Sequence, residues 1–418
     1  MSASTKMKNW KTIRIFILNL STICISPLVR LIPRKRDKWL FGATQSLKDN
    51  PKYLFYWTIE HHPEIRAIWI SHQKADVKYL RAHGLEAYHV WSLKGLFHAI
   101  TAKVFISDHQ VGDINQYLSG GAFYVNLWHG SSVKRVRWQA PQLFVRKHNL
   151  KNADEMRTSF RVRVLEYPYL FRKPDLLLAP STIQKNEFFA PMMDIPVERC
   201  VVGVYPRSRL LIEGKEAAIE FIHKFESQHT ANFVTEISKY KKVYMYMPTW
   251  RNDDSDFIKH ACIDWESLNN AMKNRNELFI LKLHPLTKTV LHEKVEYSHI
   301  KLFPKNSDIY TILPFVDTLI TDYSSIYSDF LTMDKEIILF VFDYDSYVKK
   351  SYDLSEYDKY FVGVKAYNFE SLLALLVNGH DCHIPQAERK RLLDFFWDSH
   401  EKNIDLVEEI KKRIHFYD

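Results

Sequence analysis

The segment EIILFVF at residues 336–342 is apolar at six of its seven positions, and the segment DLLLA at residues 175–179 repeats the pattern in the first half of the chain. A short apolar run without polar alternation is typical of a strand buried on both faces of a parallel sheet. Similar runs alternate with helical patterns such as 50–61 and 265–274, which predicts βαβ units. The expected strands are 39–43, 67–71, 103–107, 123–128, 175–179, 242–247, 278–283, 317–321 and 336–342.

The domain organisation follows from the length of 418 residues, which predicts two domains with substantial cores. We expect an α/β fold in which two Rossmann-like domains face each other across a cleft. The boundary is expected near 205–240, and the C-terminal helices at about 385–413 are expected to pack across the domain junction. The expected division is a membrane-surface segment at 1–36, an N-terminal domain at 37–205 and a C-terminal domain at 206–418.

Glycine is scarce: the chain has 11, where average usage would give about 29. Neither G-x-G-x-x-G nor G-x-x-x-x-G-K-[ST] occurs, so the dinucleotide fingerprint and the P-loop are excluded. A phosphate site in this chain must therefore work without a glycine-rich loop. The four cysteines form no C-x-x-C pair, which favours a reducing cytoplasm over a disulfide framework.

The net charge of +9 is concentrated at the N-terminus, where residues 1–48 hold ten Lys or Arg and one acid. Residues 15–29 carry no charge but fall short of the roughly 20 needed to span a bilayer. We expect an interfacial helix on the anionic cytoplasmic leaflet, making the protein a peripheral membrane protein. A signal peptide and a helix packed on the core are the alternatives. Nucleic acid is not an expected partner, because the rest of the chain sums to zero charge.

Polar residues follow four of the expected strands, where ligands of open parallel sheets bind. The first group is His129–Gly130 after the strand at 123–128, with Lys134 close behind. An imidazole titrates near neutrality, so His129 is a candidate general base, and Lys134 a candidate anion ligand. The alternative is a structural histidine beside a turn.

The second and third groups follow the strands at 242–247 and 278–283. Arg251 offers a fork of N–H donors that suits phosphate. Asn252, Asp253 and Asp254 follow it, and this acidic pair is better explained as a solvated turn than as a metal site. Lys282 lies inside an apolar strand, where a charge is costly unless it is paired or reaches a ligand. His284 follows it, and a loop cap is its structural alternative.

The fourth group is Asp322-Tyr-Ser324-Ser325, between the strand at 317–321 and an expected helix at 324–331. Free N–H groups at a helix start bind anions, although an ordinary serine N-cap is equally compatible with the pattern. Together the four groups supply a base, cations and an anion site, and no metal or cofactor is expected. This set favours transfer of a phosphate-bearing group from a nucleotide-diphosphate donor to a hydroxyl.

At these residues the sequence resembles the CDP-glycerol glycerophosphotransferase family of teichoic-acid and capsule polymer enzymes. The similarity covers about residues 39–342. The matching segments are WLFGATQSLKDNPKYLF (39–55), LWHGSSVK (127–134), GVYPRSR (203–209), MPTWRND (247–253), LKLHP (281–285) and TDYSSIYSDF (321–330).

The resemblance implies a GT-B-like fold, with 37–205 as acceptor domain and 206–418 as donor-nucleotide domain. It implies a CDP-glycerol or CDP-ribitol donor, a lipid-linked saccharide or growing polymer as acceptor, and release of CMP. By the same resemblance His129 is the base and His284 a second catalytic histidine. The implied substrate-binding residues are Gly130, Lys134, Arg207, Arg251, Lys282, Asp322, Ser324 and Ser325.

Three departures from the family pattern leave the polyol and the acceptor open. Ser131–Ser132 stands where Thr-Pro is frequent, Ser208–Arg209 replaces an Asn-Asp type ending, and no Pro-Gly-Pro-like segment lies near 361–367. Two other functions remain as alternatives: a nucleotide-sugar glycosyltransferase of the same fold, and a non-catalytic membrane-surface scaffold with a degenerate nucleotide pocket.

Overall fold

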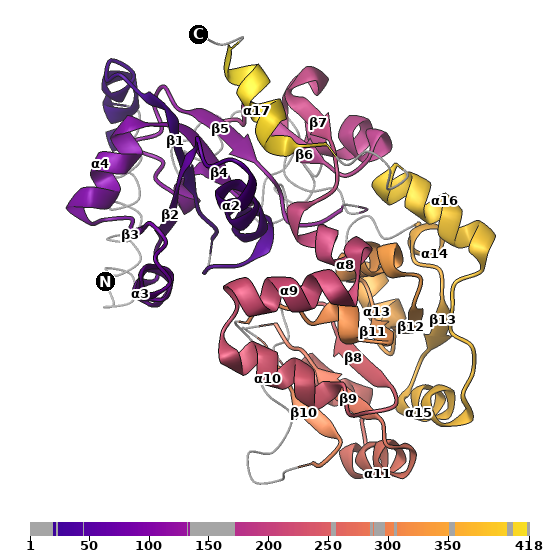
Figure 1. Cartoon of the computed structure of the whole chain (residues 1–418). Coiled ribbons are helices and arrows are strands. Elements are labelled where there is room, and N and C mark those ends of the chain that lie inside the picture. The colour runs from indigo at the N-terminus through magenta and orange to yellow at the C-terminus, as the bar shows by residue number, and fades with distance from the viewer. Residues whose placement is uncertain are drawn as a thin grey trace, which may run out of the picture. The chain divides into compact units, whose positions relative to one another are not determined.

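Two separate parallel sheets organise the chain in the computed structural model (Figure 1). The structure describes residues 20–21, 24–44, 46–131, 133, 172–251, 256–284, 287, 297–304, 307–350, 356–398 and 404–415. One compact unit comprises residues 1–129, 135–206 and 400–418, and the other comprises 130–134 and 207–399.

The sheet of the first unit has seven strands in the order β3-β2-β1-β4-β5-β6-β7, and every neighbouring pair is parallel. The strands are β1 (Lys35–Phe41), β2 (Arg66–Ser71), β3 (Ala87–His89), β4 (Ala102–Ser107), β5 (Phe123–Asn126), β6 (Leu176–Ala179) and β7 (Cys200–Val202). The helices of this unit are α2 (Asp49–His61), α3 (Lys74–Ala82), α4 (Leu93–Thr101), α7 (Ala190–Met193) and α17 (Leu406–His415), with a π-helical turn at Gln184–Phe189.

The alternation of side chains along the central strands explains why helices cover both faces of this sheet. On one face Phe41 and Trp69 pack edge-on against Phe55 of α2, with ring centroids 5.5 and 5.6 Å away. On the other face Leu40 joins a core cluster with Ala99 of α4. The strands are buried on both sides, as their apolar runs predicted.

The sheet of the second unit has six parallel strands in the order β10-β9-β8-β11-β12-β13. They are β8 (Val243–Met247), β9 (Leu278–Leu281), β10 (Ile300–Leu302), β11 (Thr318–Thr321), β12 (Glu336–Phe340) and β13 (Val364–Ala366). The helices are α8 (Arg209–Glu213), α9 (Lys215–Phe225), α10 (Gln228–Ile237), α11 (Trp265–Arg275), α12 (Ile326–Phe330), α13 (Tyr344–Lys350), α14 (Tyr357–Tyr360), α15 (Phe369–Asn378) and α16 (Gln386–Trp397).

In each sheet the chain adds strands first on one side of the starting strand and then on the other. This switch point lies between β1 and β4 in the first unit and between β8 and β11 in the second. Ligands of open parallel sheets bind beyond the carboxyl ends of the strands at such a switch point. The expected α/β fold with parallel sheets is confirmed. The switch points also single out the segments after β1 and β4, and after β8 and β11, as places where a ligand could bind.

The C-terminal limit of the second unit differs from the expected one. We assigned 206–418 to one domain, but residues 400–418 group with the first unit (Figure 1). α16 stays with the second unit, where Trp397 Nε1 donates to the Ser328 carbonyl at 2.7 Å. α17 returns to the first unit, where Arg413 Nη1 donates to the Glu198 carbonyl at 2.6 Å.

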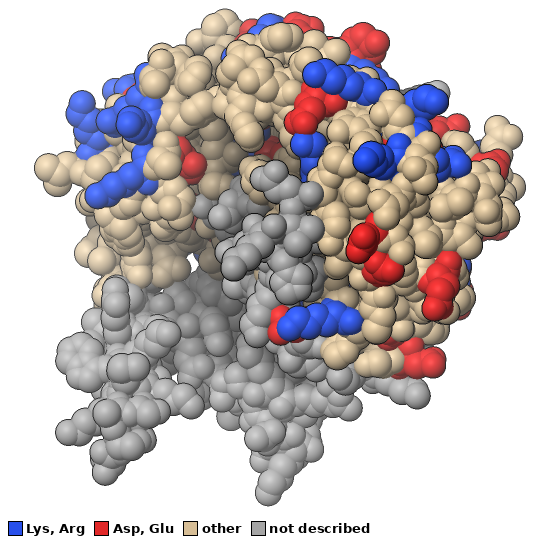
Figure 2. All heavy atoms as spheres, turned by 90° about the horizontal axis from the view of Figure 1, so that it is seen from below, with Lys and Arg blue, Asp and Glu red and all other residues tan. Residues whose placement is uncertain are grey.

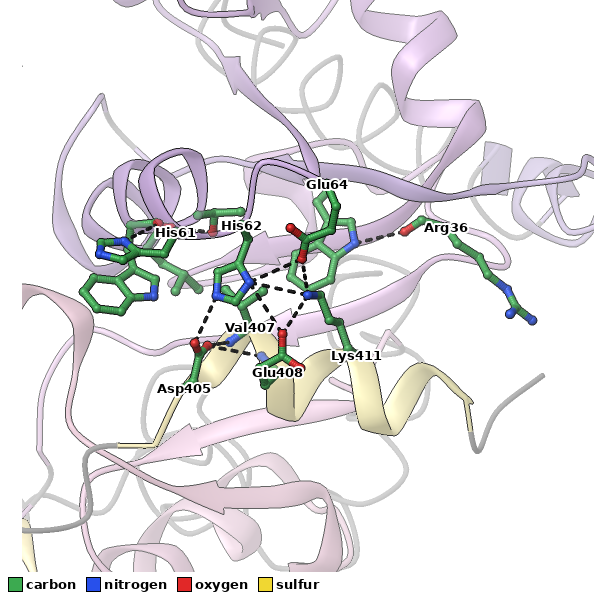
Figure 3. Close-up of polar contacts among 12 residues, drawn as sticks. Arg36, His61, His62, Glu64, Asp405, Val407, Glu408 and Lys411 are labelled. Atoms are coloured by element: carbon green, nitrogen blue, oxygen red, sulfur yellow. Dashed lines mark hydrogen bonds and ion pairs between the residues drawn. The ribbon is translucent and has the colours of Figure 1, made fainter.

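A polar cluster fixes α17 to the end of α2 (Figure 3). His62 is buried, and its Nε2 lies 3.0 Å from a carboxylate oxygen of Asp405. Lys411 Nζ contacts Glu64 and lies 2.7 Å from Glu408. These charges, together with the buried Val407 and Ile410, hold the helix on the first unit.

The basic N-terminal region is only partly available to a membrane. Lys38 is 1% exposed and donates to Thr101 Oγ1 at 2.8 Å, and burial followed by the charge of Arg66 lowers its pKa. Arg34 donates to the carbonyls of Ala99, Ala102, Leu118 and Gly120, and burial lowers its pKa to about 10. β1 begins at Lys35, so the expected limit of the surface segment at residue 36 falls inside a strand.

Much of the apolar stretch at 15–29 lies outside the described residues, and 24–29 are helical. Across the described parts of the chain, we find no helix with the length and hydrophobicity to cross a bilayer.

Candidate functional site

The turn after β5 presents His129 to solvent. Trp128, just before it, has a φ of +53°, a left-handed conformation that costs a residue with a Cβ about 1–3 kcal/mol. The Trp128 side chain is buried; its ring stacks on the His129 imidazole with centroids 4.4 Å apart and packs edge-on against Phe189 of the π-helical turn. Strained backbone of this kind persists where the surroundings hold it, and it clusters at functional sites.

A second histidine lies beside this turn. His109 follows β4, the strand at the switch point, and its ring stacks on that of His129 with centroids 5.7 Å apart and planes 22° apart. The parallel pairing of β4 with β5 brings the two loops together. Sequence reasoning missed His109, although its position two residues after an apolar strand was the available signal.

Gly130, Ser131 and Val133, which follow His129 in the LWHGSSVK motif, group with the second unit. Gly130 has a φ of +152°, and a Cβ there would lie 2.9 Å from Ser325 Oγ. Glycine is therefore required at this position for both backbone and space. Lys134 lies outside the described residues.

In the second unit, Arg251 lies buried between two carboxylates after β8. Its Nε and Nη2 donate to both oxygens of Asp343 at 2.8 and 3.0 Å, and Nη2 also donates to Asp322 at 2.9 Å. Its Nη1 donates to the Thr249 carbonyl at 2.6 Å. Burial opposes the charge, but the Asp322 and Asp343 carboxylates hold the pKa of Arg251 above its usual range.

These contacts change the expected role of Arg251. We expected its fork to face a phosphate, but four of its five N–H groups donate within the protein. The rings of Phe257, Tyr323 and Tyr347 lie 4.3–5.1 Å from its guanidinium carbon. The geometry is that of a clamp between the loops after β8, β11 and β12.

Asp322 is completely buried and takes part in the same clamp. Its Oδ1 accepts from the Thr249 N–H at 2.9 Å, the Thr249 hydroxyl at 2.6 Å and the Tyr323 N–H at 2.5 Å. A carboxylate with these donors and a guanidinium orders the turn that follows β11.

That turn carries Ser324 and Ser325, which reach the surface at the β8–β11 switch point. Ser325 is the N-cap of α12, but its side chain makes no capping hydrogen bond. The helix is shorter than expected, because Ile326–Phe330 passes into a 3-10 turn at Leu331. The serine hydroxyls and the backbone N–H groups of this turn are suited to an anion.

His284 and Lys282 lie at the end of β9, next to β8. The His284 ring stacks on Trp250 with centroids 5.4 Å apart, and both side chains are partly exposed. Lys282 Nζ lies 5.9 Å from the centre of the Phe303 ring, and the side chain is partly buried. Both residues therefore lie at the carboxyl ends of the strands in the sheet that carries Arg251 and Asp322.

Arg207 is 3% exposed and pairs with Asp329 of α12 at 2.7 Å. The hydroxyl of Tyr310 donates to the same carboxylate oxygen, and the Tyr310 ring lies 4.4 Å from the guanidinium carbon. Sequence reasoning missed Asp329 and Asp343 as partners, because no spacing rule links a buried arginine to a carboxylate on a distant element.

Within the described residues, two groups of His and acidic side chains are close enough together to bind a metal ion. They are His62 with Glu64 and Glu408, and Glu336 with Asp381 and His383. A lysine ammonium already contacts each group, Lys411 in the first and Lys242 in the second.

Comparison with known proteins shows which family the chain is related to. Residues 25–403 match the family described as CDP-Glycerol:Poly(glycerophosphate) glycerophosphotransferase. The teichoic acid glycerol-phosphate transferase of Staphylococcus aureus is 24% identical over 304 residues, 72% of each chain. The teichoic acid poly(glycerol phosphate) polymerase of Bacillus spizizenii is 24% identical over 340 residues, 77% of each chain.

Among solved structures, a histidine-to-asparagine variant of the wall teichoic acid polymerase TagF soaked with CDPG has a TM-score of 0.71 and 18% identity, with complete coverage of both chains. At this identity the likeness shows a common fold. The family match spans nine-tenths of the sequence and includes every motif discussed above. The chain therefore belongs to the CDP-glycerol:poly(glycerophosphate) glycerophosphotransferase family.

Proposed function

We propose that this phosphotransferase moves glycerol phosphate from CDP-glycerol to a hydroxyl of a growing teichoic-acid polymer or of its lipid-linked saccharide primer. The family match and the two glycerol-phosphate relatives support the reaction. The observation that carries the assignment to a site is the strained turn after β5, which holds an exposed imidazole at the carboxyl edge of a parallel sheet.

In the proposed mechanism the acceptor hydroxyl attacks the β-phosphorus of the donor in line with the phosphoanhydride oxygen. His129 takes the hydroxyl proton as the new phosphoester bond forms. The phosphoanhydride bond breaks, and its electron pair leaves with CMP. Positioning and charge stabilisation supply most of the rate in such transfers.

The donor phosphates are proposed to bind at the turn after β11. Ser324 and Ser325 supply hydroxyl and backbone donors there, and His284 and Lys282 supply N–H donors from the end of β9. Arg251 and Asp322 support this site by fixing the turn, and Arg207 fixes α12 through Asp329. Gly130 gives the turn after His129 its backbone freedom, and Lys134 is proposed as a further phosphate ligand.

Donor screening tests the proposal. The purified chain is incubated with a lipid-linked saccharide or a glycerol-phosphate oligomer and with CDP-glycerol, CDP-ribitol or a UDP-sugar. Mass measurement of the product is expected to show addition of one or more glycerol phosphate units and equimolar CMP. Release of UDP with a sugar added would assign the glycosyltransferase alternative, and CDP-glycerol binding without turnover would assign the scaffold alternative.

We also propose that the first unit binds the cytoplasmic face of the membrane. Large apolar side chains are exposed in two segments that contact the same loop at 117–121: Leu28 and Leu31 before β1, and Trp91, Leu93 and Phe97 at α4. Trp91 lies against Tyr117, and Arg30 lies against Gly121. Figure 2 shows Lys and Arg on several parts of the visible face, including the side where Figure 1 places α3 and α4. Exposed apolar side chains on a surface that also carries cations suit an anionic lipid surface.

Vesicle sedimentation tests this second proposal. Replacing Leu31 and Leu93 by aspartate is expected to abolish co-sedimentation with vesicles that contain anionic lipid. Tyr367→Asp, at an exposed aromatic side chain of the second unit, is the control and should sediment like the wild type. Undiminished sedimentation of the double variant would contradict the proposed surface.

A further inference from the structure

Both backbone polar groups of Trp128, the residue before His129, are bonded to asparagine side chains. Asn126, the last residue of β5, is 1% exposed, and its Oδ1 accepts from the Trp128 N–H at 2.8 Å. Asn50, in the first turn of α2, is completely buried, and its Nδ2 donates to the Trp128 carbonyl at 2.8 Å. These bonds hold Trp128 in its left-handed conformation from two different elements.

Asn126 also reaches the loop that carries the second histidine. Its Nδ2 donates to the His109 carbonyl at 3.2 Å and to the Tyr124 hydroxyl at 3.0 Å. One amide therefore joins the His109 backbone to the backbone before His129. The two loops joined in this way carry the stacked His109, His129 and Trp128 rings.

The hydrogen bonds of Asn126 and Asn50 described above go to other groups of the protein, and the proposed chemistry assigns neither side chain a contact with the substrate. A buried amide in this position is costly unless all its groups are bonded, and here the bonds go to the backbone that precedes His129. A shift of about 1 Å in a reacting group is enough to cost about 10²-fold in rate.

We propose that Asn126 and Asn50 are positioning residues that fix the His129 imidazole through the backbone of Trp128. The inference rests on the proposed role of His129 as the base. It predicts that either asparagine acts on the reaction through His129 alone, and that Asn126 also sets the stacking of His109 on His129.

Kinetics with a matched control give the first test. Asn126→Ala and Asn50→Ala should each lower kcat about 10²-fold while KM for CDP-glycerol stays within twofold. Adding Asn126→Ala to His129→Ala should lower kcat no further than His129→Ala does. The control is Asn115→Ala, which removes a buried amide of the same unit that accepts from the Tyr117 and Leu118 N–H groups at 3.1 Å. Its kcat should equal that of the wild type.

Histidine ring NMR gives a second readout that does not depend on turnover. In protein labelled at histidine, the His129 ring signal is identified by its loss in His129→Ala. Contacts from this ring to Trp128 and His109 are expected in the wild type and in Asn115→Ala, and their loss is expected in Asn126→Ala. The two asparagines lie on different elements, so a folding failure in one variant leaves the other to decide.

The outcomes separate the inference from the function on which it rests. Unchanged kcat and unchanged ring contacts in the folded asparagine variants would overturn the positioning role. Additive losses in Asn126→Ala with His129→Ala would also overturn it, because Asn126 would then act by another route. Full activity of folded His129→Ala would refute the base assignment instead, and the ring contacts would still report on positioning.

Discussion

Replacing Arg251 by methionine separates two roles for this residue, phosphate ligand and internal clamp. The change removes the guanidinium but keeps an apolar stem against Phe257, Tyr323 and Tyr347. Four donated hydrogen bonds are lost, and the carboxylates of Asp322 and Asp343 lose their common cation.

The magnitude follows from the burial of the two carboxylates. Breaking a buried ion pair by removing one partner costs about 3–5 kcal/mol. Asp322 is completely buried but keeps three donors on Oδ1, and Asp343 is partly exposed and can rehydrate. We therefore expect the free energy of unfolding to fall by about 3 kcal/mol, the lower end of this range. With a urea slope of about 1–3 kcal/mol per molar, the unfolding midpoint should fall by about 1–3 M.

The assay is urea unfolding followed by tryptophan fluorescence, with CDP-glycerol binding measured in parallel below the transition. Asp343→Asn in the Arg251→Met background removes one unpaired carboxylate and should recover part of the lost stability. Arg391→Met is the control: it breaks an exposed pair with Glu388 and should cost under about 1 kcal/mol. A wild-type midpoint for Arg251→Met, with only donor binding weakened, would refute the clamp and restore the phosphate-ligand role.

Three further predictions concern the rest of the chain. Burial lowers the pKa of His98 to about 4. Between pH 6.5 and 4 the unfolded chain therefore binds a proton that the native state does not bind, and Tm should fall as the pH drops through this range. His98→Phe should reduce this fall in Tm. Lys411→Met leaves Glu64 and Glu408 without their ammonium, and hydrogen exchange in α17 should accelerate roughly fivefold, for a loss of about 1 kcal/mol; unchanged exchange would show that Val407 and Ile410 suffice. Gly130→Ala should lower Tm more than Gly84→Ala, since both have positive φ but only Gly130 meets a neighbour within 4 Å.

The sequence predicted the central strands well and the edge strands not at all. β6 and β12 are buried on both faces. A strand buried in this way is apolar at nearly every position, so it can be recognised from the sequence. The missed strands β3, β7, β10 and β13 each have three residues and stand at the edges of the two sheets. An edge strand is paired on one side only, so its sequence carries little of this signal.

The motif residues could be placed at strand ends from sequence, but their partners could not. Arg251 and Asp343 are 92 positions apart, and Arg207 and Asp329 are 122 apart. Such pairs depend on the order of strands in the sheet, which periodicity does not specify. The placement of Arg34 and Lys38 could not be predicted for the same reason. Their basic run predicted that both face a membrane surface, whereas their side chains donate hydrogen bonds to residues of α4.

The most direct test of the central claim is CMP release from CDP-glycerol by His129→Ala in the presence of a glycerol-phosphate acceptor. Loss of a general base lowers a rate about 10²–10⁴-fold, and the account predicts a loss in that range with folding and CDP-glycerol binding retained. CMP release at the wild-type rate by a folded His129→Ala protein would contradict the account.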